Sequence, residues 1–190
     1  MLKLPRTIRL DPSDTFVFER AAEPGEWAVV GSFLFWDADI PNLAGKARAA
    51  FRAGFVGVDS LGFSTLVVVT KATEAERDGA VEALARHIHE RLGAPSIEAA
   101  RGAAREEIDF AASLCQEDEG TIIAMHRSLE GEKIREQFRS LHRRDSGIAG
   151  ADRLHAHARA FELVETDEEE PAERVDLAGL VQGKPAEAKR

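Results

Sequence analysis

The acids best placed to form a ligand site flank segments rich in aromatic residues and glycine. Asp37 and Asp39 could face one side if the strand before them continues, and Asp59 follows a second strand segment. Paired carboxylates coordinate hard cations or share a proton. This pattern allows a pocket for a small molecule, or a small active site, near Asp37, Asp59 and Ser64, with Arg52 contacting an anion. The competing interpretation is turn chemistry, because an aspartate before Ile-Pro-Asn is typical of a helix cap.

Two pairs of histidines have spacings that suggest metal ligands. His87 and His89 fall on a predicted helix, where residues two apart point about 200° away from each other and cannot share an ion. They are predicted to face solvent. His155 and His157 would share one side of a strand and could bind a metal or an anion, but neither cysteine nor carboxylate stands nearby at ligand spacing.

Two further features have ordinary structural explanations. Gly57 and Gly62 have the spacing of a phosphate-binding loop, but neither the lysine nor the helix that such a loop needs follows them. Cys115 lies near the end of a predicted helix, where the negative dipole raises the pKa of a thiol, so we interpret it as a core residue. The sequence therefore predicts no catalytic residues, no cofactor and no metal.

Aromatic residues gather in residues 27–36, which β propensity predicts as one long strand that bends at Gly31. Apolar side chains would point to both of its faces, so both faces need cover. A face left without cover would be a docking surface for a protein partner or for a second copy of the chain. The tentative partner-binding residues are Trp27, Phe33, Phe35 and Trp36.

Composition and charge narrow the class of protein. The chain has 190 residues, one cysteine and a formal net charge of −9. Phosphate backbones repel such a surface, so we expect no nucleic-acid partner. An anion-binding role for Arg135, Arg139, Arg143 and Arg144 is disfavoured for the same reason, and a solvated helix face is preferred. With neither a signal peptide nor a membrane span in view, we expect a cytoplasmic protein.

The C-terminal residues differ from the rest of the chain. Residues 165–173 read ETDEEEPAE, and a block of like charges solvates itself and does not pack. We therefore predict one domain over residues 1–165 and a disordered acidic tail over residues 166–190. Within that tail, residues 175–181 could form a short helix that binds a partner.

Hydrophobic periodicity and turn signals predict an α+β fold: a mainly antiparallel sheet of about six strands with an αα-hairpin packed on one face. Thr73 with Glu76 forms a capping box at the start of the first helix of that hairpin, and Gly93 ends this helix. The other predicted elements are a β-hairpin around residues 8–18, a helix after Pro41, strands over 55–59, 65–71 and 121–127, a helix over 128–141, and a short helix and closing strand within 154–164.

Two segments carry a resemblance to a known family. They are LPRTIRLDPSDTFVFERAAEPGEWAV, residues 4–29, and AFRAGFVGVDSLGFSTLVVV, residues 50–69. Over residues 4–164 the chain resembles an uncharacterised proteobacterial family with a domain of unknown function. The resemblance implies an accessory or maturation role beside molybdenum- and iron–sulfur-dependent oxidoreductases of the formate dehydrogenase kind. The resemblance identifies no catalytic residue in this sequence.

Two functions from different classes follow from these observations. The leading prediction is a non-enzymatic accessory or assembly protein that binds a protein partner through aromatic strand surface. The alternative is a small enzyme or ligand-binding domain that uses the acids around Asp37 and Asp59.

Overall fold

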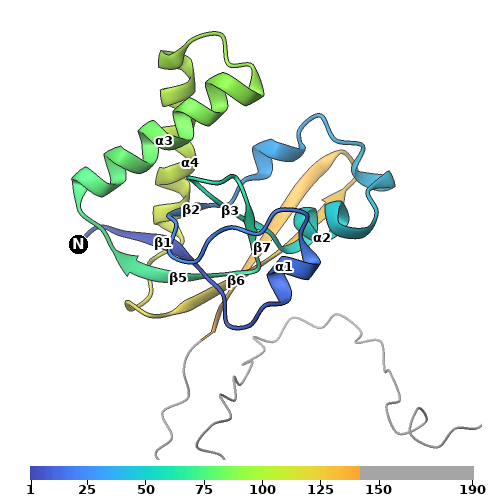
Figure 1. Cartoon of the computed structure of the whole chain (residues 1–190), viewed down its shortest axis with the longest axis horizontal. Helices are drawn as coiled ribbons and strands as arrows, with labels where there is room; N and C mark the ends of the chain where they lie inside the picture. Colours follow the sequence, from blue (N-terminus) through green and yellow to red (C-terminus); the bar gives the residue numbers. More distant parts are fainter. Residues whose placement is uncertain (142–190) are drawn as a thin grey trace, which may run out of the picture.

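The computed structural model describes residues 1–141, in which short strands and helices are followed by a helical hairpin and a β-hairpin (Figure 1). Within residues 1–141 the strands are β1 (Lys3–Ile8), β2 (Ala28–Val29), β3 (Phe55–Gly57), β4 (Phe63–Ser64), β5 (Leu66–Lys71), β6 (Ile122–Glu130) and β7 (Lys133–Leu141). The α-helices are α1 (Ser13–Val17), α2 (Gly45–Ala53), α3 (Glu74–Leu92) and α4 (Ile97–Ser113), and the 3-10 helices are η1 (Ser32–Phe35) and η2 (Ile40–Asn42). The predicted α+β class is confirmed.

The larger sheet has four strands in the order β1-β5-β6-β7, and every neighbouring pair is antiparallel. Its central strand β5 places Val67 between Thr7 of β1 and Ile123 of β6. Val67 and Val69 are fully buried, as expected for alternate residues whose face lies on the core. The strand predicted over residues 65–71 is confirmed, and it begins at Leu66.

The smaller sheet consists of β2, β3 and β4, again antiparallel. Its strands are only two or three residues long, yet β3 is buried throughout. What the sequence predicts as one sheet of about six strands is therefore two sheets, which share the core between them.

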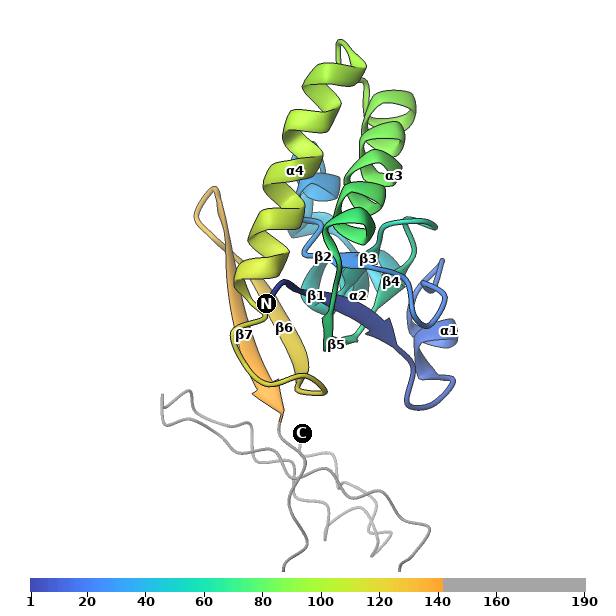
Figure 2. The same cartoon turned by 90° about the vertical axis from the view of Figure 1, so that its left-hand side faces the viewer.

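Helices α3 and α4 form the predicted hairpin, and α4 packs against β1 and β2 (Figure 2). The capping box is present, since the Thr73 hydroxyl accepts a hydrogen bond from the Glu76 amide and the Glu76 carboxylate accepts one from the Thr73 amide. Gly93 adopts a φ of 76° at the end of α3, and the Ser96 hydroxyl caps α4. The facing stripes consist of buried Val81, Leu84, Ala85, Ile88, Ala100, Ala104, Ile108 and Ala111.

The prediction of one long strand over residues 27–36 is wrong. The strand covers only Ala28–Val29, and the chain then turns at Gly31 into η1. Gly31 has a φ of 81°, and a Cβ at this position would overlap the buried side chain of Val56. Only glycine meets both conditions, so backbone geometry outweighs the β propensity of the aromatic residues around it.

The prediction of a helix over residues 128–141 is also wrong, because this stretch forms most of the β6–β7 hairpin. Glu130 pairs with Lys133 across a tight turn in which Gly131 has a φ of 62°. Half-buried Ile134 and Glu136 alternate with exposed Lys133 and Arg135, which is the period of a strand. Near the N-terminus, residues 13–17 form α1 where the second strand of a hairpin was predicted.

Several predictions lie outside the described residues. They concern the helix and strand within 154–164, His155 and His157, Arg143 and Arg144, and the residues from 166 onward.

Replacing Gly31 by alanine tests the turn that ends β2. The forced φ and the overlap with Val56 should lower the free energy of unfolding by about 3 kcal/mol. The matched control is Gly79→Ala on α3, where a Cβ would meet no atom, and a gain of about 0.5–1 kcal/mol is expected there. Urea denaturation measures both, and equal stability of the two variants would contradict this account of the turn.

Candidate functional site

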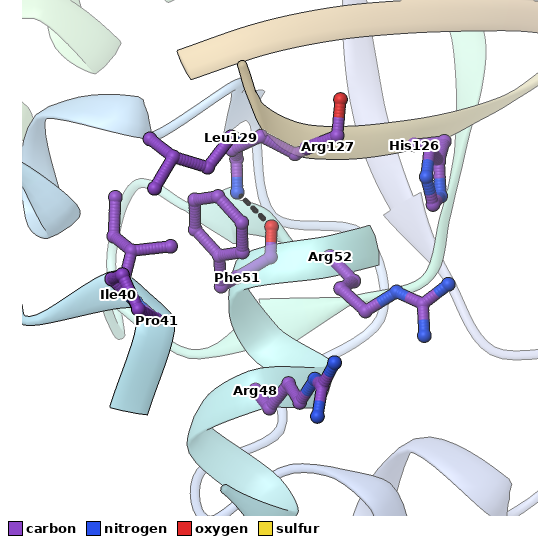
Figure 3. Close-up of a pocket in the computed structure, with 9 residues that line it drawn as sticks. Ile40, Pro41, Arg48, Phe51, Arg52, His126, Arg127 and Leu129 are labelled. Atoms are coloured by element: carbon purple, nitrogen blue, oxygen red, sulfur yellow. Dashed lines mark hydrogen bonds between the residues drawn. The ribbon is translucent and has the colours of Figure 1, made fainter. Parts of the chain in front are cut away.

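A cavity of about 320 Å³ opens between α2, η2 and β6, and it joins an apolar wall to a basic one (Figure 3). The apolar wall consists of Ile40, Pro41, Phe51 and Leu129. The basic wall consists of Arg48, Arg52 and His126. The two arginines are four residues apart on α2 and so project from one face of that helix.

The charges on the basic wall are available to a ligand. Arg48, Arg52 and His126 are exposed, and within residues 1–141 their side chains form neither ion pairs nor hydrogen bonds with protein groups. None of the residues that line the cavity is an acid. Guanidinium groups bind carboxylates and phosphates through paired hydrogen bonds, so this wall suits an anion.

Arg127 lies behind the cavity and holds its wall in place. Its guanidinium is fully buried and donates hydrogen bonds to the backbone carbonyls of Phe51, at 2.6 Å, and Val30, at 2.7 Å. It also forms an ion pair with Glu136 at 3.1 Å. The dashed line in Figure 3 marks the bond to Phe51, the residue before Arg52. Arg127 therefore fixes α2 against β6.

Two carboxylates share the surroundings of Arg127. Glu136 on β7 accepts hydrogen bonds from Arg127 and from the hydroxyl of Ser32. Burial, and after it the negative charge of Glu136, raise the pKa of Glu107 on α4 to about 7, against the opposing effects of the Gly31 amide and Arg127. This cluster joins β7, α4 and the turn at Gly31.

The sequence could have signalled this cluster in part. Arg127 lies on the same face of β6 as buried Ile123 and Met125, two residues after Met125. Glu107 adjoins the apolar stripe of its helix, between Ala104 and Ile108. A charged residue at a buried position is informative, because burying it without a partner is costly.

Only one of the four predicted partner-binding aromatic residues is strongly exposed. Phe35 is buried edge-to-face against Phe51, and Phe33 packs against the core under the helical hairpin. Trp27 lies against the guanidinium of Arg6, which is 3.8 Å from the ring centroid. Trp36 exposes 74% of its surface.

The residues of the alternative ligand pocket lie in different surroundings. The Ser64 hydroxyl is buried and shares its single hydrogen between the backbone carbonyls of Leu66, at 2.8 Å, and Ile8, at 3.1 Å. Asp37 and Asp59 are exposed, and of the four residues only Arg52 lines the cavity between α2 and β6. The Asp39 carboxylate accepts a hydrogen bond from the Asn42 amide, which fits the interpretation as turn chemistry.

Of the other candidates for chemistry, His89 and Cys115 lie as predicted, whereas His87 is half-buried where the sequence predicts a side chain that faces solvent. His87 contacts the carbonyl of Asp59 and His89 that of Ala94, so the two rings do not converge. Cys115 is buried in the core, and burial raises the pKa of its thiol to about 11.

No cluster of three or more histidine, cysteine, aspartate and glutamate side chains within residues 1–141 could hold a metal ion. Among the helices in this part of the chain, none has the length and apolar character needed to cross a membrane.

Replacing Arg127 by methionine should lower the free energy of unfolding by about 3–5 kcal/mol, since the Glu136 carboxylate and two carbonyls would lose their donor. Adding Glu136→Gln should restore at least about 1 kcal/mol, because it removes the unpaired charge. Urea denaturation of both variants measures the effect. A single variant as stable as the parent would show that Arg127 does not hold these elements together.

Glu107 makes stability depend on pH. Its pKa of about 7 lies above the ordinary value of 4.5, so the folded protein holds a proton that the unfolded chain releases between these pH values. The free energy of unfolding should therefore fall as the pH rises from 4.5 to 7, by roughly 2 kcal/mol. Glu107→Gln should flatten this dependence, whereas Glu106→Gln, at the exposed neighbouring residue, should keep it. Identical pH profiles of the two variants in urea denaturation would refute the assignment.

Comparison with known proteins identifies the family of this chain but no activity. No curated protein and no solved structure matches the chain. A family model described as a family of unknown function, DUF6505, matches residues 1–160, which include every residue that lines the cavity. The expected membership of a domain family of unknown function is thereby confirmed, and the chain belongs to the DUF6505 family.

Proposed function

We propose that the protein is a non-enzymatic binding protein that holds an acidic segment of a protein partner in the cavity between α2 and β6. One observation carries this proposal: Arg48, Arg52 and His126 line a cavity of about 320 Å³ that has no acid on its walls. A bound carboxylate would meet two guanidinium groups that have no other partner within residues 1–141.

The cavity favours a peptide over a nucleic acid. A net charge of −9 repels a long polyanion, whereas a short acidic segment meets only the local positive charge. Ile40, Pro41 and Leu129 offer apolar contact to aliphatic side chains between the acids. Trp36, which precedes η2 by a few residues, adds an exposed aromatic ring of the kind that is common in interfaces.

The class of partner comes from the resemblance described above. On that basis we propose an accessory or assembly role in the cytoplasm for a molybdenum- and iron–sulfur-dependent oxidoreductase of the formate dehydrogenase kind. An acidic segment of such an enzyme, or of one of its maturation factors, would be the ligand. The alternative of a small enzyme or ligand-binding domain that uses Asp37, Asp59 and Ser64 stays a prediction.

A labelled peptide of alternating glutamate and leucine, used as a probe with the full-length protein, tests the binding role. Charge reversal in the double variant Arg48→Glu/Arg52→Glu should weaken binding at least about tenfold, because it replaces attraction by repulsion at the cavity. Fluorescence anisotropy measures the affinity, and raising the salt concentration should weaken binding of the parent protein more than that of the variant.

The matched control is Arg86→Glu/Arg91→Glu on α3, which changes the net charge equally but lies outside the cavity. It should bind the probe within about threefold of the parent protein. Equal weakening by both double variants would overturn the proposed function.

A further inference from the structure

The chain contains an acidic sequence of the type that the cavity would bind. Residues 165–173, termed the acidic segment below, carry six carboxylates and no basic residue. They also include a threonine, a proline and an alanine, which flank a run of four consecutive acids over residues 167–170. This composition matches the two walls of the cavity, one basic and one apolar.

We propose that the acidic segment occupies the cavity of its own chain and competes there with the partner. This inference rests on the proposed function, because it assumes that the cavity binds acidic segments. It adds a regulatory element: the protein would bind a partner only when that partner displaces the segment.

The connection is long enough for this contact. The described chain ends with Leu141, which pairs with Ile122, and His126 of the cavity pairs with Gln137. Four residues of β7 therefore separate the end of the described chain from the level of His126, a distance of about 14 Å along the strand. Residues 142–164 connect Leu141 to the acidic segment, and 23 residues can extend to about 75 Å.

Tethering makes the contact strong even if each ion pair is weak. A segment on a connection of this length experiences an effective concentration in the range of about 1 mM, far above that of a typical cellular partner. Several other cations of the folded body already have acidic partners. Examples are the ion pairs of Lys71 with Glu119, Arg77 with Asp109 and Arg101 with Glu82.

Competition for the cavity can be separated from a general effect of charge. The test variant is the full-length chain in which all six acids of the segment become amides: Glu165→Gln, Asp167→Asn, Glu168→Gln, Glu169→Gln, Glu170→Gln and Glu173→Gln. The control carries six such changes at exposed acids of the folded body: Glu74→Gln, Glu90→Gln, Glu98→Gln, Glu106→Gln, Glu117→Gln and Asp118→Asn. Both variants alter the net charge equally.

The segment variant should bind the glutamate–leucine probe at least about tenfold more tightly than the parent protein, and the control should stay within about threefold. Adding Arg48→Glu and Arg52→Glu to the segment variant should abolish the gain. Without any probe, the NMR signals of the His126 ring should differ between the segment variant and the parent, and coincide between the control and the parent. The gain should not depend on protein concentration, since the contact is intramolecular.

The outcomes separate the two proposals. If the parent and the segment variant bind the probe equally well at the cavity, self-occupation is refuted while the binding role stands. If neither binds the probe, the binding role fails and the inference fails with it. A gain that vanishes on dilution would refute the intramolecular contact in favour of exchange between copies of the chain.

Discussion

The buried guanidinium of Arg127 is the interaction on which the arrangement of this protein depends. Each of its three nitrogens donates a hydrogen bond, and the acceptors belong to β7, to α2 and to the chain just after β2. A charge in the core is tolerated only when its partners are all in place, because desolvation otherwise outweighs attraction. Burial accordingly lowers the pKa of Arg127, and the hydrogen bond and charge of Glu136 oppose this effect. The cluster thus favours one relative position of three elements that are distant in the sequence.

The hydrogen bonds of Arg127 also determine the shape of the cavity. Arg127 binds the carbonyl of Phe51, and Phe51 also packs against Phe35, so the C-terminal half of α2 is held on two sides. Arg48 and Arg52 project from that helix, while His126 comes from the strand that carries Arg127 itself. Side chains that face a ligand are more effective when the elements beneath them are fixed, because less order has to be gained on binding.

The sequence predicts the fold best where signals are local. Thr73, Glu76, Gly93 and Ser96 mark the ends of α3 and α4 through capping chemistry within a few residues, and both helices lie as predicted. The prediction is wrong for residues 27–36 and 128–141, where distant contacts decide. Gly31 turns because Val56 leaves no room for a side chain, and the β7 strand forms because it pairs with β6. Of the residues that line the cavity, the sequence predicts only Arg52 as part of a ligand site, because the walls come from segments about 80 residues apart.

The position of β7 at the border of the larger sheet also bears on self-association. Within residues 1–141, β7 is hydrogen-bonded to β6 alone, so its outer backbone groups could template another strand. Lys133 and Arg139 place positive charge along it. If the β7 edges of two molecules came together, like charges would face one another, and this repulsion disfavours edge-to-edge aggregation of the folded protein. A strand of opposite charge would meet no such repulsion.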